Sequence, residues 1–256
     1  MSDPVICDTD GAVLTVRMNR PDKRNALNRP MYTGIADALD RAAGDPAIRV
    51  VVLTGAGGHF TSGNDLGDFL AGDEGSGERP VARFLRTIST FPKPLIAAVS
   101  GVAVGVGTTM LLHCDLVYAD ETARLQLPFV NMGLVPEAAS SLTLPKVVGL
   151  AKAAELLMFG EFLSAVDAER AGIVNRVVPA GELDALVAER AGKLARQPAG
   201  AVRETKRLLR HATTATVTER MAEEGLLFAA ALKSPESREA MTAFLEKRAP
   251  DFSRFG

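Results

Sequence analysis

The first half of the chain carries short apolar runs of the length of β-strands. One run has an apolar residue at every second position, which predicts a strand buried on one face: Leu14, Val16 and Met18. Three further runs are apolar throughout, which predicts strands buried on both faces: residues 50–53, 95–99 and 116–119. We expect Ile48 to belong to the first of these three strands.

An amphipathic helix is predicted between the first two strands. Apolar residues recur there at helical spacing, at Met31, Ile35, Leu39 and Ala42, and Gly44-Asp45-Pro46 ends the pattern. Strands that alternate with crossover helices indicate a parallel sheet, so we expect an α/β fold.

Helical patterns dominate after about Pro136. The predicted helices cover residues 150–159, 183–194, 202–209, 217–232 and 237–245. A short strand is expected at 173–178, where Pro179 ends it. We expect a core over residues 1–195 and, over residues 196–256, a C-terminal helical subdomain whose Ala- and Leu-rich faces serve oligomerisation. The Gly- and acid-rich stretch 71–80 is either a lid or a plain linker.

Composition excludes several classes of protein. The 256 residues have a formal net charge of −2, with 29 Lys and Arg against 31 Asp and Glu, so no basic excess favours nucleic acid or an anionic membrane. Two cysteines, Cys7 and Cys114, exclude a disulfide framework, and three scattered histidines form no zinc motif. The longest apolar stretch is interrupted by polar residues and glycines, and the acidic N-terminus is unlike a signal peptide. A cytoplasmic location is expected.

Two glycine-containing loops follow buried strands, at residues 60–66 and 100–109. Each is expected to lead into a helix whose first N–H groups have no partner. Two such N–H groups that point at one position form an oxyanion hole. From the residues alone, the alternative that these glycines only relieve packing between strand and helix remains open. The chain has no Gly-x-Ser-x-Gly elbow and no Walker loop, and Gly55 to Gly58 lacks the last glycine of a dinucleotide fingerprint.

Several short motifs follow one another along the chain: Asn19-Arg20-Pro21, Asn25-Ala26-Leu27, residues 60–66, the second glycine loop, residues 114–119, residues 171–174 and Phe244-x-x-Lys247. In this order they resemble the crotonase (enoyl-CoA hydratase/isomerase) superfamily. The resemblance covers nearly the whole chain. It implies a spiral of repeated ββα turns followed by trimerising helices, a homotrimer or a dimer of trimers, and a role in fatty acid metabolism. The substrate would be an acyl-CoA, so coenzyme A belongs to the substrate and no separate cofactor or metal is expected.

The resemblance also assigns catalytic roles. The thioester oxygen would accept hydrogen bonds from the main-chain N–H groups of Asn64 and Val106. The two glutamates of the hydratases fall at Thr109 and Phe129, neither of which can act as a carboxylate base. Residues 62–66 and Val135-Pro136-Glu137 are most similar to the Δ3,Δ2-enoyl-CoA isomerase branch, whose single acid corresponds to Glu137. From the residues alone, Glu137 is a helix-start residue after a proline.

Substrate-binding positions follow from the same resemblance. They are Lys23, Arg24, Ala26, Ser62, Gly63, Asn64, Asp65, Leu66, Gly105, Phe129, Leu134 and Lys247. Ordinary solvated charge is the alternative for the three basic residues, and Asp65 is also expected to cap a helix. His59 and His113 are expected to be structural or surface residues. Apolar neighbours such as Phe129 and Leu134 should raise the pKa of Glu137.

The resulting functional hypothesis is an isomerase that converts a 3-enoyl-CoA to trans-2-enoyl-CoA. An enolate held by the two N–H groups would form, and one glutamate would carry the proton. Two alternatives remain. One is hydration or another enolate reaction on an acyl-CoA, and the other is a non-catalytic homologue that binds acyl-CoA or RNA, the RNA version being disfavoured by the near-neutral charge.

Overall fold

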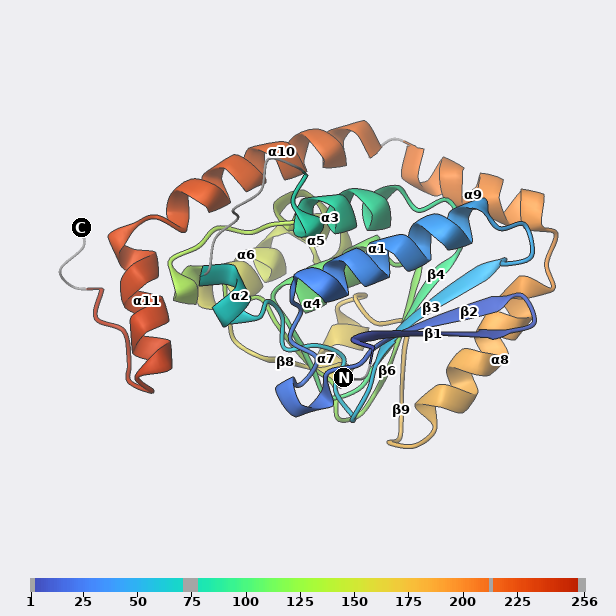
Figure 1. The fold of residues 1–256 in the computed structure, drawn as a ribbon, viewed down its shortest axis with the longest axis horizontal. Coiled ribbons are helices and arrows are strands. Elements are labelled where there is room, and N and C mark those ends of the chain that lie inside the picture. Colours follow the sequence, from blue (N-terminus) through green and yellow to red (C-terminus); the bar gives the residue numbers. More distant parts are fainter. Residues whose placement is uncertain (1–2, 71–77, 212–213, 253–256) are drawn as a thin grey trace.

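The computed structural model describes residues 3–70, 78–211 and 214–252, and its centre is a six-stranded sheet (Figure 1). The strand order is β1 (Val5–Asp10), β2 (Val13–Met18), β3 (Val50–Gly55), β4 (Leu95–Val99), β6 (Leu116–Asp120) and β9 (Arg176–Val178). Neighbouring strands run parallel except for the antiparallel hairpin of β1 and β2. The predicted α/β fold with parallel strands is therefore confirmed.

A smaller sheet stands beside the first. It contains three short strands in the order β5 (Val102–Val104), β7 (Arg124–Gln126) and β8 (Leu163–Ser164). Strand β5 lies inside the stretch that the sequence predicts as a continuous glycine loop. Because β5 pairs with β7, strand hydrogen bonds fix the backbone of this stretch.

Helices cover both faces of the larger sheet. On one face, α1 (Arg29–Gly44) and α3 (Pro80–Thr90) pack together over the main apolar core. On the other face, α8 (Leu183–Ala195) packs its buried leucines on the side chains of β3, β4 and β6. The shorter helical segments are η1 (Pro21–Lys23), α2 (Leu66–Leu70), α4 (Val106–Thr109), η2 (Met110–His113), η3 (Val130–Met132), α5 (Ser140–Val148), α6 (Leu150–Phe159) and α7 (Ala165–Arg170).

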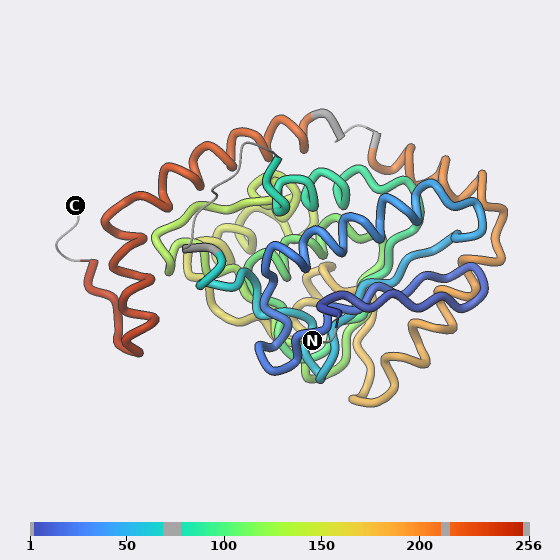
Figure 2. Tube along the Cα trace, in the orientation of Figure 1, coloured from blue at the N-terminus to red at the C-terminus, as the bar shows by residue number. Residues whose placement is uncertain are grey.

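Three C-terminal helices lie across the outside of this core. Helix α9 (Ala199–His211) leads to α10 (Thr214–Ala231), which contacts α3 and α5, and α11 (Pro235–Leu245) contacts η3. Figure 2 shows α10 passing above α3 before the chain turns at α11. The last part of the chain is thus in contact with elements from its middle.

Most predicted elements are found within a few residues of their expected bounds, and three differences beyond β5 concern the larger sheet and its edge. Strand β1 was not predicted, because its exposed residues give no apolar alternation. Ile48 lies outside β3, where its N–H donates to the Asp45 oxygen. Residues 173–175 are not strand, because the N–H groups of Ile173 and Val174 both donate to the Ala168 oxygen and close α7.

Two further points concern the described part of the chain. Residues 71–77 of the predicted lid or linker lie outside it. None of the helices within it is both long enough and apolar enough to cross a membrane.

Candidate active site

The two glycine-containing loops lie side by side. The N–H of Thr61 donates to the Val102 oxygen at 2.9 Å, and the N–H of Val104 donates to the Thr61 oxygen at 3.1 Å. On its other edge the first loop pairs with Leu27, whose N–H donates to the Gly63 oxygen and whose oxygen accepts from the N–H of Asp65. Residues 61–65 are therefore held between the segment before α1 and strand β5.

Glycines fix the direction of the two main-chain N–H groups. Gly63 has φ +88°, and a Cβ there would come within 2.7 Å of the Val104 oxygen, so only glycine fits. Gly105 has φ +55° and precedes the first turn of α4. The next residues are Asn64 and Val106, and neither N–H donates to another residue within the described ranges. These are the two residues whose N–H groups the family resemblance assigns to the thioester oxygen.

Glu137 is a buried acid beside α4. Its side chain is 9% exposed, and its Oε1 accepts a hydrogen bond from the hydroxyl of Thr109 at 2.7 Å. The pKa of Glu137 is raised to about 7, mainly by burial; the Thr109 hydrogen bond opposes this rise and the charge of Glu224 adds to it. The expected rise of this pKa is confirmed. Helix α5 begins only at Ser140, so Glu137 is not a residue of the helix start.

Tyr32 contacts the first loop, and the sequence analysis missed it. Its buried hydroxyl donates to Oδ1 of Asn64 at 2.5 Å. Burial raises the pKa of Tyr32 well above its usual value, and the charges of Glu137 and Asp68 raise it further, so the hydroxyl stays a neutral donor. The available signal was a phenol on the apolar stripe of α1, next to Met31.

One direct contact and one electrostatic interaction relate the acid to the two loops. Thr109, which donates to Glu137, belongs to the single turn that Val106 begins. Tyr32, which donates to Asn64, is close enough to Glu137 to be affected by its charge. The arrangement places a carboxylate with a pKa near neutrality against the short helix that Val106 begins, while Asn64 lies in the neighbouring glycine-containing loop. Such a site can remove a proton next to a carbonyl and stabilise the enolate.

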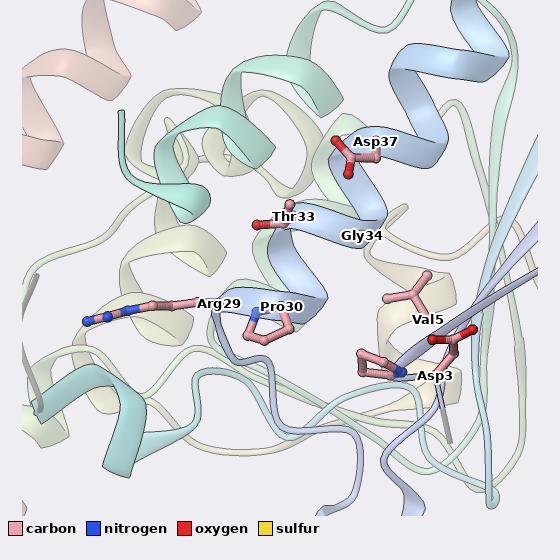
Figure 3. A pocket seen from close by; sticks show the side chains of 8 residues that line it. Asp3, Val5, Arg29, Pro30, Thr33, Gly34 and Asp37 are labelled. Atoms are coloured by element: carbon pink, nitrogen blue, oxygen red, sulfur yellow. The ribbon is translucent and has the colours of Figure 1, made fainter. Parts of the chain in front are cut away.

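A cavity of about 240 Å³ opens beside Asn64. Its lining residues come from the segment before α1, the first loop, α1, α2, the start of α3 and the end of α10: Leu27, Arg29, Tyr32, Asn64, Asp65, Asp68, Arg79, Pro80, Val81, Leu232 and Lys233. A hollow of about 510 Å³ lies elsewhere, between α1 and the start of β1, and Figure 3 shows Arg29 extending away from Asp3 and Val5 there. No candidate residue of the sequence analysis lines this hollow.

The predicted coenzyme-binding segments are also adjacent to each other. The N–H of Ser62 donates to the Arg24 oxygen at 2.9 Å and its hydroxyl to the Lys23 oxygen at 3.1 Å. Lys23 and Arg24 have exposed side chains, and the Ala26 oxygen accepts from Arg20.

Asp65 caps α2, as predicted. Its Oδ1 accepts from the N–H groups of Gly67 and Asp68, and its Oδ2 pairs with Arg20 at 3.0 Å. Leu66 is the first residue of this helix. The capping accounts for Asp65 without a catalytic role.

The remaining predicted residues differ in environment. Phe129 is buried, and Leu134 packs against the same apolar core. Lys247 is exposed after α11, and no contact within the described residues brings it to the other candidates. His59 Nδ1 lies 3.4 Å from the N–H of Val102, and His113 is buried behind Glu137, so both are structural, as expected.

Comparison with known proteins gives matches over nearly the whole chain. The family model described as Enoyl-CoA hydratase/isomerase matches residues 8–254. Enoyl-CoA delta isomerase 2 of Rattus norvegicus is 39% identical over 82% of this chain, which spans 55% of that protein. The 2,3-dehydroadipyl-CoA hydratase of Escherichia coli K12 is 35% identical over 94% of both chains. A crystal structure of an enoyl-CoA hydratase/isomerase from Pseudoalteromonas atlantica has a TM-score of 0.95 and 46% identity, covering 97% of this chain and 99% of the other.

Proposed function

Because the chain belongs to the enoyl-CoA hydratase/isomerase family of acyl-CoA enzymes, we propose that it is an enoyl-CoA isomerase. The reaction would move the double bond of a 3-enoyl-CoA to the trans-2 position. The observation that carries this proposal is the buried carboxylate of Glu137, which accepts a hydrogen bond from Thr109 of α4, the helix that begins at Val106, and whose pKa is raised to about 7.

The proposed mechanism uses one acid for both proton transfers. The carboxylate of Glu137 takes a proton from C2, and the electrons move onto the thioester oxygen, which accepts from the N–H groups of Asn64 and Val106. Each such donor typically contributes about 2.7–4 kcal/mol to stabilisation of the transition state. The acid then returns its proton to C4, so that the double bond lies between C2 and C3. No water, metal or redox cofactor takes part in this scheme.

Hydration of a 2-enoyl-CoA is less well supported by the same site. In the family resemblance, two acids position the water, and here their places hold Thr109 and Phe129. Thr109 has its hydroxyl directed to Glu137, and Phe129 is buried and apolar. The Escherichia coli relative is nevertheless named a hydratase, so hydration is the competing outcome of the experiment.

The experiment is a panel of 2-enoyl and 3-enoyl thioesters of several chain lengths, followed for double-bond migration and for hydration. We expect the protein to convert 3-enoyl-CoA to 2-enoyl-CoA. In Glu137→Gln, turnover should fall by about 10²–10⁴-fold, the usual contribution of a general base, while acyl-CoA binding changes little.

Three results would contradict the proposal. If Glu137→Gln converts 3-enoyl-CoA at the native rate, Glu137 is not the catalytic base. Rapid loss of the enoyl absorbance of crotonyl-CoA would indicate hydration. Tight binding of acyl-CoA in calorimetry without turnover of any substrate would favour a non-catalytic homologue.

The proposal includes the roles that the resemblance assigns to the rest of the chain. Lys23 and Arg24, exposed beside the first loop, would meet the coenzyme phosphates, and Lys247 would reach them from a neighbouring subunit. A homotrimer or dimer of trimers is supported by large apolar side chains that a single chain leaves exposed, among them Leu150, Met158 and Phe159 of α6.

A further inference from the structure

Glu137 stands on a backbone segment of unusual conformation. The next two residues, Ala138 and Ala139, both have positive φ, +59° and +55°, a region that residues other than glycine seldom occupy. Two such residues in succession persist only where surrounding contacts hold them. The direction of the Glu137 side chain depends on these contacts, because the segment links it to α5.

Glu224 of α10 supplies one set of contacts. This carboxylate is 5% exposed, and its Oε2 accepts from the N–H of Ala139 at 2.5 Å. Its Oε1 accepts from the N–H of Ser141 at 3.0 Å and from the Ser141 hydroxyl. One side chain therefore binds three donors of the segment that follows Glu137, from a position 85 residues beyond Ala139 in sequence.

His113 of η2 supplies a second contact. Its Nε2 lies 2.8 Å from the Ala138 oxygen. Burial lowers the pKa of His113 to about 4, so the ring is neutral at pH 7 and Nε2 must carry the proton that this carbonyl accepts. The main-chain oxygen of His113 in turn accepts from Arg210 of α9 at 2.9 Å. The segment is thus held between η2 and α10.

We propose that Glu224 is a positioning residue for the reaction, since its carboxylate holds Ala139 and Ser141 and so determines where the Glu137 carboxylate points. This inference rests on the proposed function only in taking Glu137 as the base. It connects the C-terminal helix α10 to the chemistry of the site, although Glu224 itself does not touch the substrate in this scheme.

The charge of Glu224 has a second effect. It raises the pKa of Glu137, as a neighbouring negative charge does. The other titratable or charged groups facing this region are Tyr32 of α1, His113 of η2, Arg210 of α9 and Arg220 of α10. Burial raises the pKa of Glu224 itself, and its hydrogen bonds from Ser141 and Ala139 and the charge of Arg220 oppose this rise. Removing the Glu224 charge should therefore make Glu137 lose its proton at lower pH.

The test compares Glu224→Gln with Glu219→Gln, an exposed acid on the same helix, in the folded full-length protein. We expect Glu224→Gln to lower kcat by about 10- to 100-fold, the scale of a displaced catalytic group, with KM nearly unchanged. In the pH profile of kcat/KM, the acid limb of Glu224→Gln should move to lower pH. Glu219→Gln should keep the wild-type values for all three quantities.

Ser141→Ala keeps the proposal testable if Glu224→Gln does not fold. It removes one of the three donors but leaves the Glu224 charge, so kcat should fall by about threefold or more while the acid limb stays in place. A folded Glu224→Gln with wild-type kcat and pH profile would overturn the positioning role, as would a wild-type kcat in Ser141→Ala.

The two proposals fail in different ways. If Glu137→Gln keeps full activity, Glu137 is not the base, whatever the result for Glu224→Gln. Loss of activity in Glu137→Gln together with wild-type behaviour of Glu224→Gln would leave the proposed function intact and remove only the positioning role.

Discussion

At the scale of the residue, Glu137 combines two opposing requirements. A carboxyl group prefers water, yet this one is 9% exposed and has an uncharged hydroxyl as its hydrogen-bond partner. The protein therefore holds it in a place where its charged form is unfavourable. A base of this kind has a pKa near neutral pH, where proton transfer to and from a carbon acid is most efficient.

The same burial predicts a pH-dependent stability difference between the wild type and Glu137→Gln. The pKa of Glu137 is about 7 when folded, against 4.5 as the ordinary value, so its favourable contribution exists below pH 4.5 and is lost as pH rises through 7. Glutamine does not titrate and keeps an oxygen for Thr109. Relative to wild type, the variant should become more stable between pH 4.5 and 8, by about 3 kcal/mol.

Urea unfolding from pH 5 to 8 measures this difference. His113 titrates in the opposite sense, because its lowered pKa removes stability as pH falls from 6.5 through about 4, but it is present in both proteins and cancels. A difference between the two proteins that stays constant over this pH range would show that Glu137 is not buried as described.

At the scale of the element, the site depends on short segments with little regular structure. The first loop is held by Leu27 on one side and by β5 on the other, and α4 is a single turn. The sequence indicated the two glycine-containing loops but did not predict β5, because an apolar pattern of three residues is too short to indicate a strand. It also could not show that the two loops pair, since this depends on the placement of β5 against Thr61.

Gly63→Ala tests this arrangement. An alanine at this position would have an unfavourable φ of +88°, and its Cβ would lie 2.7 Å from the Val104 oxygen. The loop must therefore shift, and this shift also moves the N–H of Asn64. We expect kcat to fall by about 10²–10³-fold, as when one oxyanion donor is lost.

Gly11→Ala is the matched control. Gly11 also has a positive φ, +55°, but no atom lies within 4 Å of its Cβ position, in the turn between β1 and β2. It should lose about 1 kcal/mol of stability and keep the wild-type kcat. Equal kcat for the two variants would show that the loop does not position a catalytic donor.

At the scale of the whole molecule, buried polar contacts attach the C-terminal helices to the core. Lys206 of α9 donates to the Lys93 oxygen and to Asp115 Oδ2, both at 2.7 Å. Asp115 also accepts from the N–H of Leu95 at the start of β4 and pairs with Arg210. Together with Glu224, these contacts connect helices from the end of the chain to the central sheet and to the candidate site.

Lys206→Met should therefore lower the free energy of unfolding by about 2–4 kcal/mol, because it removes one of the two cations paired with Asp115 and leaves the Lys93 oxygen without the Lys206 donor. Arg207→Met removes an exposed ion pair with Glu204 from the same helix and should change stability by no more than about 0.5 kcal/mol. Urea denaturation of both variants measures the two effects. Equal losses would mean that the Lys206 contacts do not hold α9 to the core.

The sequence by itself determined most of the longer strands and helices and the two glycine-containing loops, because apolar periodicity and residue types are visible within a few turns of chain. The acid and the two main-chain donors were assigned through the resemblance to the enoyl-CoA hydratase/isomerase family and not through a local pattern. Only the tertiary structure decided that Tyr32 contacts Asn64, that Thr109 contacts Glu137, and that Glu224 holds Ala139. Such contacts join residues from 28 to 85 positions apart, and they depend on how the elements pack, so no local pattern encodes them.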